Sequence, residues 1–468
     1  MRLAACEVIL VSPYELGRQP FALAEPAALL AGEGFRVTCL DLSLQKLASI
    51  AWRDAALVAI YLGMHTATRI ALEALPRIRA LAPRARLCAY GLYAPMNAGL
   101  LQACGVSKII GGEFEPELLA AARDARDGGT GDAAATPVVH RGKVDFVVPA
   151  RAGLPPLDRY ARLVLPDGAE KTVAFVEASR GCKHWCRHCP VVPVYEGRFR
   201  AVPAAIVLAD IRQQVVQGAQ HVSFGDPDFL NGPTHALRIV RALHAEFPAL
   251  TWDATIKVQH LIEHTDLLPE FGRDGCLFIT SAVEAVDDRI LEHLAKNHTC
   301  ADFERTVALL RAAGIAFAPT FVAFTPWTTL EGYVAQLESL ARLDLIENVP
   351  PVQLTIRLLV PEGSHLLKLP GFRDLLDPFD ARILGYPWRH GDPRVDRLQQ
   401  ALQDFIGRAE TQALPRLEVF AAIWRMAHAA LGQIAPPPAI TGANRAIPRL
   451  SEPWYCCAEP TNQQLAAF

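Results

Sequence analysis

Three closely spaced cysteines in the middle of the chain are the residues best suited to bind a metal centre. Cys182, Cys186 and Cys189 follow a CxxxCxxC spacing. A [4Fe–4S] cluster held by three cysteines keeps one iron open for another ligand. A structural zinc ion is the alternative, because it takes four protein ligands and His184 or His188 could supply the fourth.

Two adjacent cysteines, Cys456 and Cys457, form a second candidate site near the end of the sequence. They follow Trp454 and Tyr455 in the string SEPWYCCAEP, and disordered tails rarely carry aromatic residues. Thiolates are soft ligands and strong nucleophiles, so the pair could hold a thiophilic atom, carry a substrate covalently or be redox-active. We predict that both are catalytic, the alternative being two incidental cysteines.

Charged residues follow several predicted strands of the central region. Asp226 and Asp228 come directly after a strand at 221–224, and Glu284 ends another strand. Catalytic loops of β/α barrels lie at the carboxyl ends of strands, so these carboxylates could bind a cofactor amino group or a substrate. Asp226 and Asp228 could equally serve only as turn formers. His298 is expected to be satisfied by a backbone carbonyl.

The elements that must position these residues fall into two α/β regions. Residues 1–125 alternate strands and helices, which predicts a doubly wound, Rossmann-like domain with ligand loops at 12–19, 63–68 and 91–97. Residues 126–165 are a predicted linker, and 166–375 alternate again. Strands are predicted there at 172–176, 221–224, 252–256, 277–283, 316–324 and 351–360. This pattern predicts a partial (β/α)6 barrel, followed by a helical region at 376–450 and a Cys-Cys tail at 451–468.

The string Ser179-Arg180-Gly181 and the cysteine spacing after it resemble the radical S-adenosylmethionine (SAM) superfamily. The resemblance implies a [4Fe–4S] cluster on the three cysteines, with SAM bound to the fourth iron and cleaved reductively. Glu284 matches an acidic residue that contacts SAM, and Lys296 lies near the same rim. The residues that we assign to cofactor binding are His188, Asp226, Asp228, Glu284, Lys296 and Arg357.

Residues 1–125 resemble the cobalamin-binding domain that precedes many radical SAM cores, including the late Gly111-Gly112-Glu113. The Asp-x-His-x-x-Gly motif of proteins that ligate cobalamin through histidine is absent. Cobalamin is therefore a possible third cofactor. The alternative is a domain that only packs on the core.

The Cys-Cys-Ala-Glu-Pro string resembles radical SAM proteins named for a CUAEP or CCAEP tail, in which selenocysteine can replace the residue matching Cys457. A similar enzyme, the arsenic-alkylating radical SAM enzyme of arsinothricin biosynthesis, binds trivalent arsenic through a cysteine-rich tail and transfers the 3-amino-3-carboxypropyl group of SAM. Its tail motif differs and includes another cysteine. Here a third thiol would have to come from elsewhere, such as Cys300.

The composition of the chain restricts the classes of molecule that this protein is expected to bind. The net charge is −3 and no basic stripe is visible, which argues against nucleic acid, and no apolar run is long enough to cross a membrane. Scattered cysteines indicate a reduced, cytoplasmic setting rather than a disulfide framework. We expect a small-molecule or thiol-bound substrate and an electron donor such as flavodoxin or ferredoxin.

Three functions are compatible with the sequence. The first is a radical SAM transferase acting on a substrate at Cys456 and Cys457, with transfer to As(III) as its boldest form. The second is a cobalamin-dependent radical SAM methyltransferase. The third is not an enzyme but a redox or metalloid sensor, which is disfavoured because no output module is visible.

Overall fold

The computed structural model describes residues 7–128, 136–439 and 446–452. Its N-terminal domain is built on a six-stranded, all-parallel sheet with the strand order β2-β1-β3-β4-β5-β6. The strands are β1 (Glu7–Ser12), β2 (Arg36–Asp41), β3 (Ala55–Tyr61), β4 (Arg86–Tyr90), β5 (Lys108–Gly112) and β6 (Val138–His140). The last strand comes from the predicted linker, so the sheet extends beyond residue 125.

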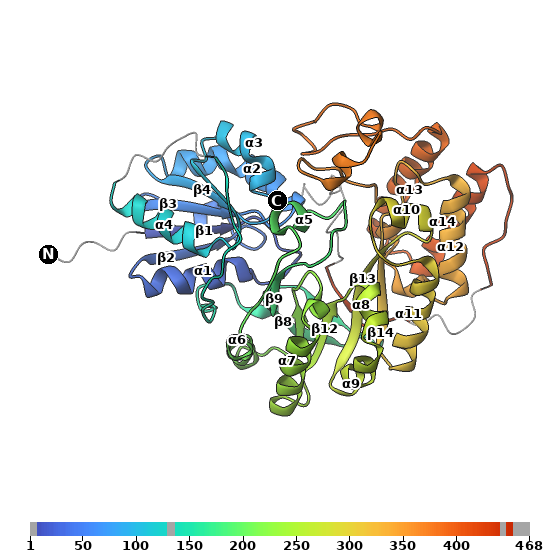
Figure 1. The fold of residues 1–468 in the computed structure, drawn as a ribbon, viewed down its shortest axis with the longest axis horizontal. Helices are drawn as coiled ribbons and strands as arrows, with labels where there is room; N and C mark the ends of the chain where they lie inside the picture. The colour runs from blue at the N-terminus through green and yellow to red at the C-terminus, as the bar shows by residue number, and fades with distance from the viewer. Residues whose placement is uncertain (1–6, 129–135, 440–445, 453–468) are drawn as a thin grey trace.

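Helices cover both faces of this sheet, as a doubly wound fold requires (Figure 1). They are α1 (Phe21–Gly32), α2 (His65–Leu81), α3 (Ala98–Ala103) and α4 (Glu115–Arg126). Alternate residues of β1 enter two separate cores. Val8 and Leu10 pack with residues of α1 and α4, whereas Ile9 and Val11 pack with residues of α2 and α3. The predicted Rossmann-like architecture is confirmed.

The second sheet is a curled half-barrel with the order β14-β13-β12-β11-β8-β7-β15. Five strands are parallel: β8 (Glu170–Val176), β11 (His221–Phe224), β12 (Thr251–Thr255), β13 (Cys276–Glu284) and β14 (Ala316–Phe321). Two short strands, β7 (Arg162–Val164) and β15 (Arg449–Leu450), extend the edge in antiparallel pairing. The end of the described chain is thus joined to the beginning of the barrel.

The helices of the barrel follow its strands and lie on its outer side (Figure 1). They are α6 (Ala204–Val216), α7 (Pro233–Glu246), α8 (Val258–Glu263), α9 (Leu268–Arg273), α10 (Asp288–His293), α11 (Cys300–Ala312) and α12 (Leu330–Arg342). Two further helices, α13 (Pro393–Thr411) and α14 (Arg416–Ala430), form the C-terminal helical region. Their apolar faces join the barrel core, so this region is part of the same packed unit.

The sixth predicted strand, 351–360, is wrong as a strand. Pro351–Leu354 is a 3-10 helix, and only Arg357 forms a parallel bridge, with Phe324. Proline has no backbone N–H, so it cannot donate a hydrogen bond to a neighbouring strand. In its place, the side chain of Gln353 accepts a hydrogen bond from the Phe321 N–H at 3.1 Å. The sixth strand of the half-barrel is therefore reduced to a single bridge.

None of the helices in the described part of the chain is long and apolar enough to span a lipid bilayer.

Candidate active site

The cysteine loop leaves the barrel at the carboxyl end of β8 and is framed by a small hairpin. β9 (Ser179–Gly181) pairs with β10 (Phe199–Ala201), and α5 (Val191–Tyr195) lies between them. Gly181 has a φ of +70°, and a Cβ there would lie 2.3 Å from the Arg198 carbonyl oxygen. Only glycine fits this turn, which explains the residue directly before the first cysteine.

The cysteine loop also brings donors other than thiols together. Among the described residues, Cys182, His184 and Asp228 form a group whose ligand atoms all lie within 4.8 Å of one another. His184 is one of the two histidines considered as a fourth zinc ligand from the sequence. A [4Fe–4S] cluster would instead bind each of the three thiols to a different iron.

Burial raises the pKa of the Cys182 thiol to about 11, and the nearby Asp228 carboxylate adds to the shift. A thiol in this environment ionises only if a cation stabilises the thiolate. All eight cysteines in the described part of the chain are free, so no disulfide competes for these sulfurs. The donor set therefore fits iron binding.

Glu284, Lys296 and His188 form a buried charged group beside the cysteines. The Glu284 Oε1 atom lies 3.0 Å from His188 Nε2 and 3.3 Å from Lys296 Nζ. Burial alone would raise the pKa of Glu284, but Lys296 and His188 outweigh it and hold the pKa at about 2. Burial disfavours the Lys296 ammonium, yet Glu284 raises its pKa above the usual range. An ionised carboxylate beside a buried cation can bind the amino acid part of a ligand such as SAM.

Asp226 and Asp228 are both buried but have different surroundings. Asp226 accepts hydrogen bonds from the Ala178 N–H at 3.0 Å and from the Ser179 hydroxyl, and burial raises its pKa to about 7. These contacts fix the turn that precedes the cysteines. Asp226 is not among the residues that line the cavity described below, so it positions the loop.

Asp228 lies between two imidazoles that the sequence did not associate with it. His184 Nε2 is 3.2 Å and His260 Nδ1 is 2.7 Å from its Oδ2 atom. Burial alone would raise the pKa of Asp228, but these two histidines lower it below the usual range. Lys257 Nζ lies 3.2 Å from His184 Nδ1 and completes a polar wall next to Cys182.

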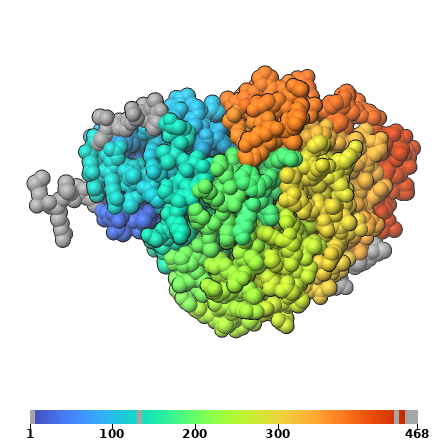
Figure 2. All heavy atoms as spheres, viewed as in Figure 1, coloured from blue at the N-terminus to red at the C-terminus, as the bar shows by residue number. Residues whose placement is uncertain are grey.

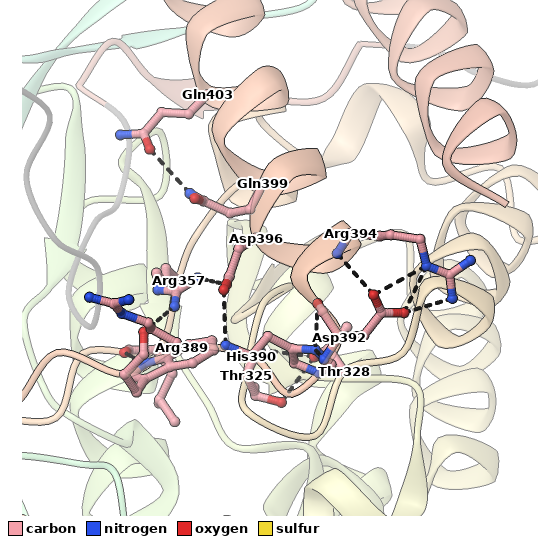
Figure 3. Close-up of polar contacts among 12 residues, drawn as sticks. Thr325, Thr328, Arg357, Arg389, His390, Asp392, Arg394, Asp396, Gln399 and Gln403 are labelled. Carbon is pink, nitrogen blue, oxygen red and sulfur yellow. Dashed lines mark hydrogen bonds and ion pairs between the residues drawn. The ribbon is translucent and has the colours of Figure 1, made fainter. Parts of the chain in front are cut away.

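The structure does not bring Arg357 to this site. Its guanidinium lies 3.5 Å from the centre of the Trp388 ring and donates to Asp396 at 2.8 Å (Figure 3). Cys300 likewise does not line the cavity but begins α11, where its N–H donates to Asp288. His298 Nε2 lies 3.2 Å from the Val283 carbonyl oxygen, as expected.

One cavity of about 300 Å³ unites the cysteine loop with the N-terminal domain. On the barrel side it is lined by the three cysteines together with His184, His188, Asp228, Lys257, Glu284 and Lys296. On the opposite side it is lined by residues at the carboxyl ends of the N-terminal strands: Tyr14, Tyr61, Gly63, Met64, Gly91, Leu92 and Gly112. All of these positions except Gly112, which ends β5, fall in or beside the loops predicted at 12–19, 63–68 and 91–97.

Arg180 joins the two domains directly beside this cavity. It lies in β9, and its buried guanidinium contacts Glu25 at 3.7 Å, Glu113 at 3.5 Å and Glu177 at 2.9 Å, and also Glu115. Three of these carboxylates belong to the N-terminal domain. No sequence motif indicates this junction, because its members are far apart in the chain.

The family model for the radical SAM superfamily matches residues 176–327. This range contains the cysteine loop, the Glu284–Lys296 pair and β11 to β14. Residues 176–327 are a radical SAM domain. Such a domain uses a [4Fe–4S] cluster and SAM, and the thiols and the adjoining charged group are suited to both. The two cofactors predicted from the sequence, a [4Fe–4S] cluster and SAM, are confirmed, whereas the residues assigned to bind them stay a prediction.

Curated relatives match the radical SAM domain but not the whole chain. The tRNA-2-methylthio-N(6)-dimethylallyladenosine synthase of Haemophilus influenzae (strain PittGG) is 27% identical over 201 residues, 41% of this chain and 42% of the relative. The enzyme of the same name from Escherichia coli O139:H28 is 28% identical over 199 residues. The chain spans about two fifths of the length of these relatives.

Two solved structures share the fold over most of the chain. The radical SAM methyltransferase TsrM from Kitasatospora setae is 21% identical with a TM-score of 0.57, covering 73% of this chain and 72% of its own. The cobalamin-dependent SAM radical enzyme OxsB is 14% identical with a TM-score of 0.64, covering 92% and 69%. The pairing of a cobalamin-binding-like domain with a radical SAM half-barrel is therefore confirmed as the fold. Cys456 and Cys457 lie outside the described residues.

Proposed function

We propose that this protein is a cobalamin-dependent radical SAM enzyme that transfers a SAM-derived methyl group to a small molecule. The observation that carries the proposal is the single cavity shared by the three cysteines and the strand ends of the N-terminal sheet. Ligands of doubly wound sheets bind at this edge. TsrM and OxsB, which have been solved with cobalamin bound, share the two-domain fold.

Each side of the cavity suits one cofactor. Cys182, Cys186 and Cys189 would hold the cluster, and Glu284 with Lys296 would orient SAM. Gly63, Gly91 and Gly112 line the opposite edge, at or just after the carboxyl ends of the N-terminal strands, where ligands of doubly wound sheets bind. Among the described lining residues of the N-terminal domain there is no histidine, so the proposed cobalamin would bind without an imidazole from that domain.

The test is cobalamin binding to the anaerobically purified protein carrying its cluster. Met64→Trp fills the cavity at the end of β3, whereas Leu81→Trp adds the same ring at an exposed position on α2. We expect Met64→Trp to lose cobalamin, measured by absorbance after gel filtration, while its iron content stays at the wild-type value. Leu81→Trp should bind normally. Equal cobalamin binding by all three proteins, or by none, contradicts the proposal.

A second function, radical transfer to a substrate held by Cys456 and Cys457, has support from the end of the described chain. β15 runs along β7, and the Tyr14 hydroxyl donates to the Glu452 carboxylate. Tyr14 also lines the cavity. Four further residues can span at most about 14 Å, so chain length permits the two thiols to enter the cavity from this anchor.

The nucleoside product separates these functions. The reduced protein is incubated with SAM, with and without arsenite, and the products are identified by mass spectrometry. S-adenosylhomocysteine supports methyl transfer, methylthioadenosine supports 3-amino-3-carboxypropyl transfer to a soft element such as As(III), and 5′-deoxyadenosine indicates hydrogen abstraction. Cys457→Ser should abolish product transfer with the cluster intact, while Cys104→Ser, a half-buried thiol of the N-terminal domain, should not. If Cys457→Ser forms the transfer product at the wild-type rate, the tail thiols take no part in the mechanism.

A further inference from the structure

A second, smaller cavity of about 80 Å³ lies next to the cavity that the cysteine loop lines. Leu16, Arg18 and Thr255 line both cavities, so the two are neighbours. Leu16 and Arg18 come from the loop after β1, where the N-terminal domain packs on the half-barrel as one continuous surface (Figure 2). None of the three cysteines lines the second cavity, so it is distinct from the proposed cluster site.

The strands β12, β13 and β14 supply one wall of this second cavity. Thr255, Thr280 and Thr320 line it, whereas the alternate residues Ala254 and Ile279 belong to the core beneath the outer helices. Thr255 and Thr280 are register partners on neighbouring strands. The second cavity therefore lies on the inner side of the half-barrel, and its strand wall presents hydroxyl groups that can donate or accept hydrogen bonds.

Two arginines from the C-terminal part of the chain also line this cavity: Arg416 at the start of α14 and Arg449 on β15. Arg416 donates to the Glu347 carbonyl oxygen, and neither guanidinium forms an ion pair with a carboxylate of the described residues. Burial lowers the pKa of Arg416 and the nearby Arg449 lowers it further, against the opposite effect of Glu347. A bound carboxylate or phosphate group would oppose both effects, because a guanidinium can donate two parallel hydrogen bonds to either group.

The carboxylates of the second cavity, unlike these two arginines, have partners of their own. Asp253 Oδ2 lies 2.9 Å from His221 Nε2, and the Glu452 carboxylate accepts a hydrogen bond from the Tyr14 hydroxyl. With Arg18 included, three arginines and two carboxylates are among the described residues that line the cavity. The lining therefore carries more positive than negative charge, which favours an anionic ligand.

We infer that the second cavity binds the substrate of the proposed methyl transfer, and that this substrate is a small organic anion with a carboxylate or phosphate group. The anionic group would contact Arg416 and Arg449, and the apolar part would lie against Phe278, Ala318 and Ile447, which line the same cavity. The residues shared by the two cavities place such a ligand next to the proposed cofactor sites. Calling this ligand the substrate rests on the proposed function, whereas the anion site itself does not.

The experiment measures binding of benzoate, phenyl phosphate and benzamide to the anaerobically purified protein carrying its cluster, by NMR line broadening. The three probes share a phenyl ring, and only benzamide is uncharged. We expect at least one of the two anions to bind about tenfold or more tightly than benzamide. Arg416→Gln/Arg449→Gln should remove this preference, and Arg449→Gln alone, at an exposed position, should reduce it. Arg425→Gln, an exposed change on the same helix α14, should leave it unchanged.

Ala318→Phe tests where the anion binds. Ala318 lines the second cavity but not the cofactor cavity, so this variant should lose anion binding while iron per protein stays at the wild-type value. Equal affinity of the wild type for all three probes, or no binding at all, overturns the inference. An unchanged anion preference in Arg416→Gln/Arg449→Gln or in Ala318→Phe also overturns it. The titration contains no SAM, reductant or cobalamin, so its failure is distinct from a failure of the cobalamin test of the proposed function.

Discussion

At the residue scale, Glu284 is held in an unusual backbone conformation. Its φ is +73°, a left-handed value that residues other than glycine rarely adopt. This conformation turns the carboxylate toward His188 and Lys296 at the end of β13. Backbone strain at a buried charged group is typical of binding sites.

Glu284→Gln keeps the shape of this side chain and removes its charge. We expect SAM affinity to fall about tenfold or more, because the buried Lys296 ammonium loses its carboxylate partner and the ligand loses an acceptor. Equilibrium dialysis of SAM against the cluster-loaded protein measures the effect. Glu263→Gln, an exposed change at the end of α8, is the matched control. Equal affinities would exclude Glu284 from SAM binding.

At the scale of elements, the turn between β8 and β9 decides where the cysteines lie. Asp226, at the end of β11, holds this turn through the Ala178 N–H and the Ser179 hydroxyl. Two neighbouring parallel strands thus fix the loop from both sides. The loop position depends on a side chain that does not itself touch the cavity.

Asp226→Ala should therefore reduce cluster occupancy, since two buried donors lose their acceptor. Each buried unsatisfied donor destabilises by about 1–3 kcal/mol. Asp226→Asn should retain most of the cluster, because its amide oxygen still accepts from Ala178 and the Ser179 hydroxyl can rotate to accept from the amide. Iron per protein after identical reconstitution is the readout. If both variants hold as much iron as the wild type, the turn does not need this bond.

At the scale of the whole molecule, Arg180 connects the domains beside the cysteine loop. Its single guanidinium contacts four carboxylates. Oxygens of three of them, Glu25, Glu113 and Glu115, have no hydrogen-bond partner in the described part of the chain. Burial, with a further contribution from Glu115, raises the pKa of Glu113 to about 7 despite Arg180. The junction therefore holds more carboxyl groups than one guanidinium can neutralise, and the Glu113 carboxyl keeps a proton up to about pH 7.

This excess predicts how stability depends on pH. Between the usual pKa of a glutamate and about 7, the native state keeps a proton on Glu113 that the unfolded state has lost, so stability falls as pH rises. Glu113→Gln should abolish that contribution and raise the free energy of unfolding at pH 8 by about 1–3 kcal/mol relative to wild type. The gain should vanish near pH 5. Denaturant unfolding at both pH values measures it, and an equal effect at pH 5 and 8 would contradict this origin.

Local motifs predicted the cluster loop, because three cysteines and a glycine turn lie within one short segment. The strand–helix alternation likewise predicted both α/β regions. Contacts between distant segments were not predictable in this way: Asp228 with His260, or Arg180 with Glu25, converge only after folding. Arg357 differs for another reason. The sequence predicts it on a sixth strand near the cofactor site, but the segment before it forms a 3-10 helix instead.

The pairing of β15 with β7 also determines when the barrel edge can be covered during synthesis. Leu450 pairs with Leu163, at opposite ends of the catalytic half of the chain. At about 5–20 residues per second, the roughly 260 residues between Cys189 and this strand take about 10–50 s to emerge. During this interval the cysteine loop has already been synthesised, but the half-barrel still lacks its edge strand β15. The edge can therefore be completed only after nearly all of the described chain has been made.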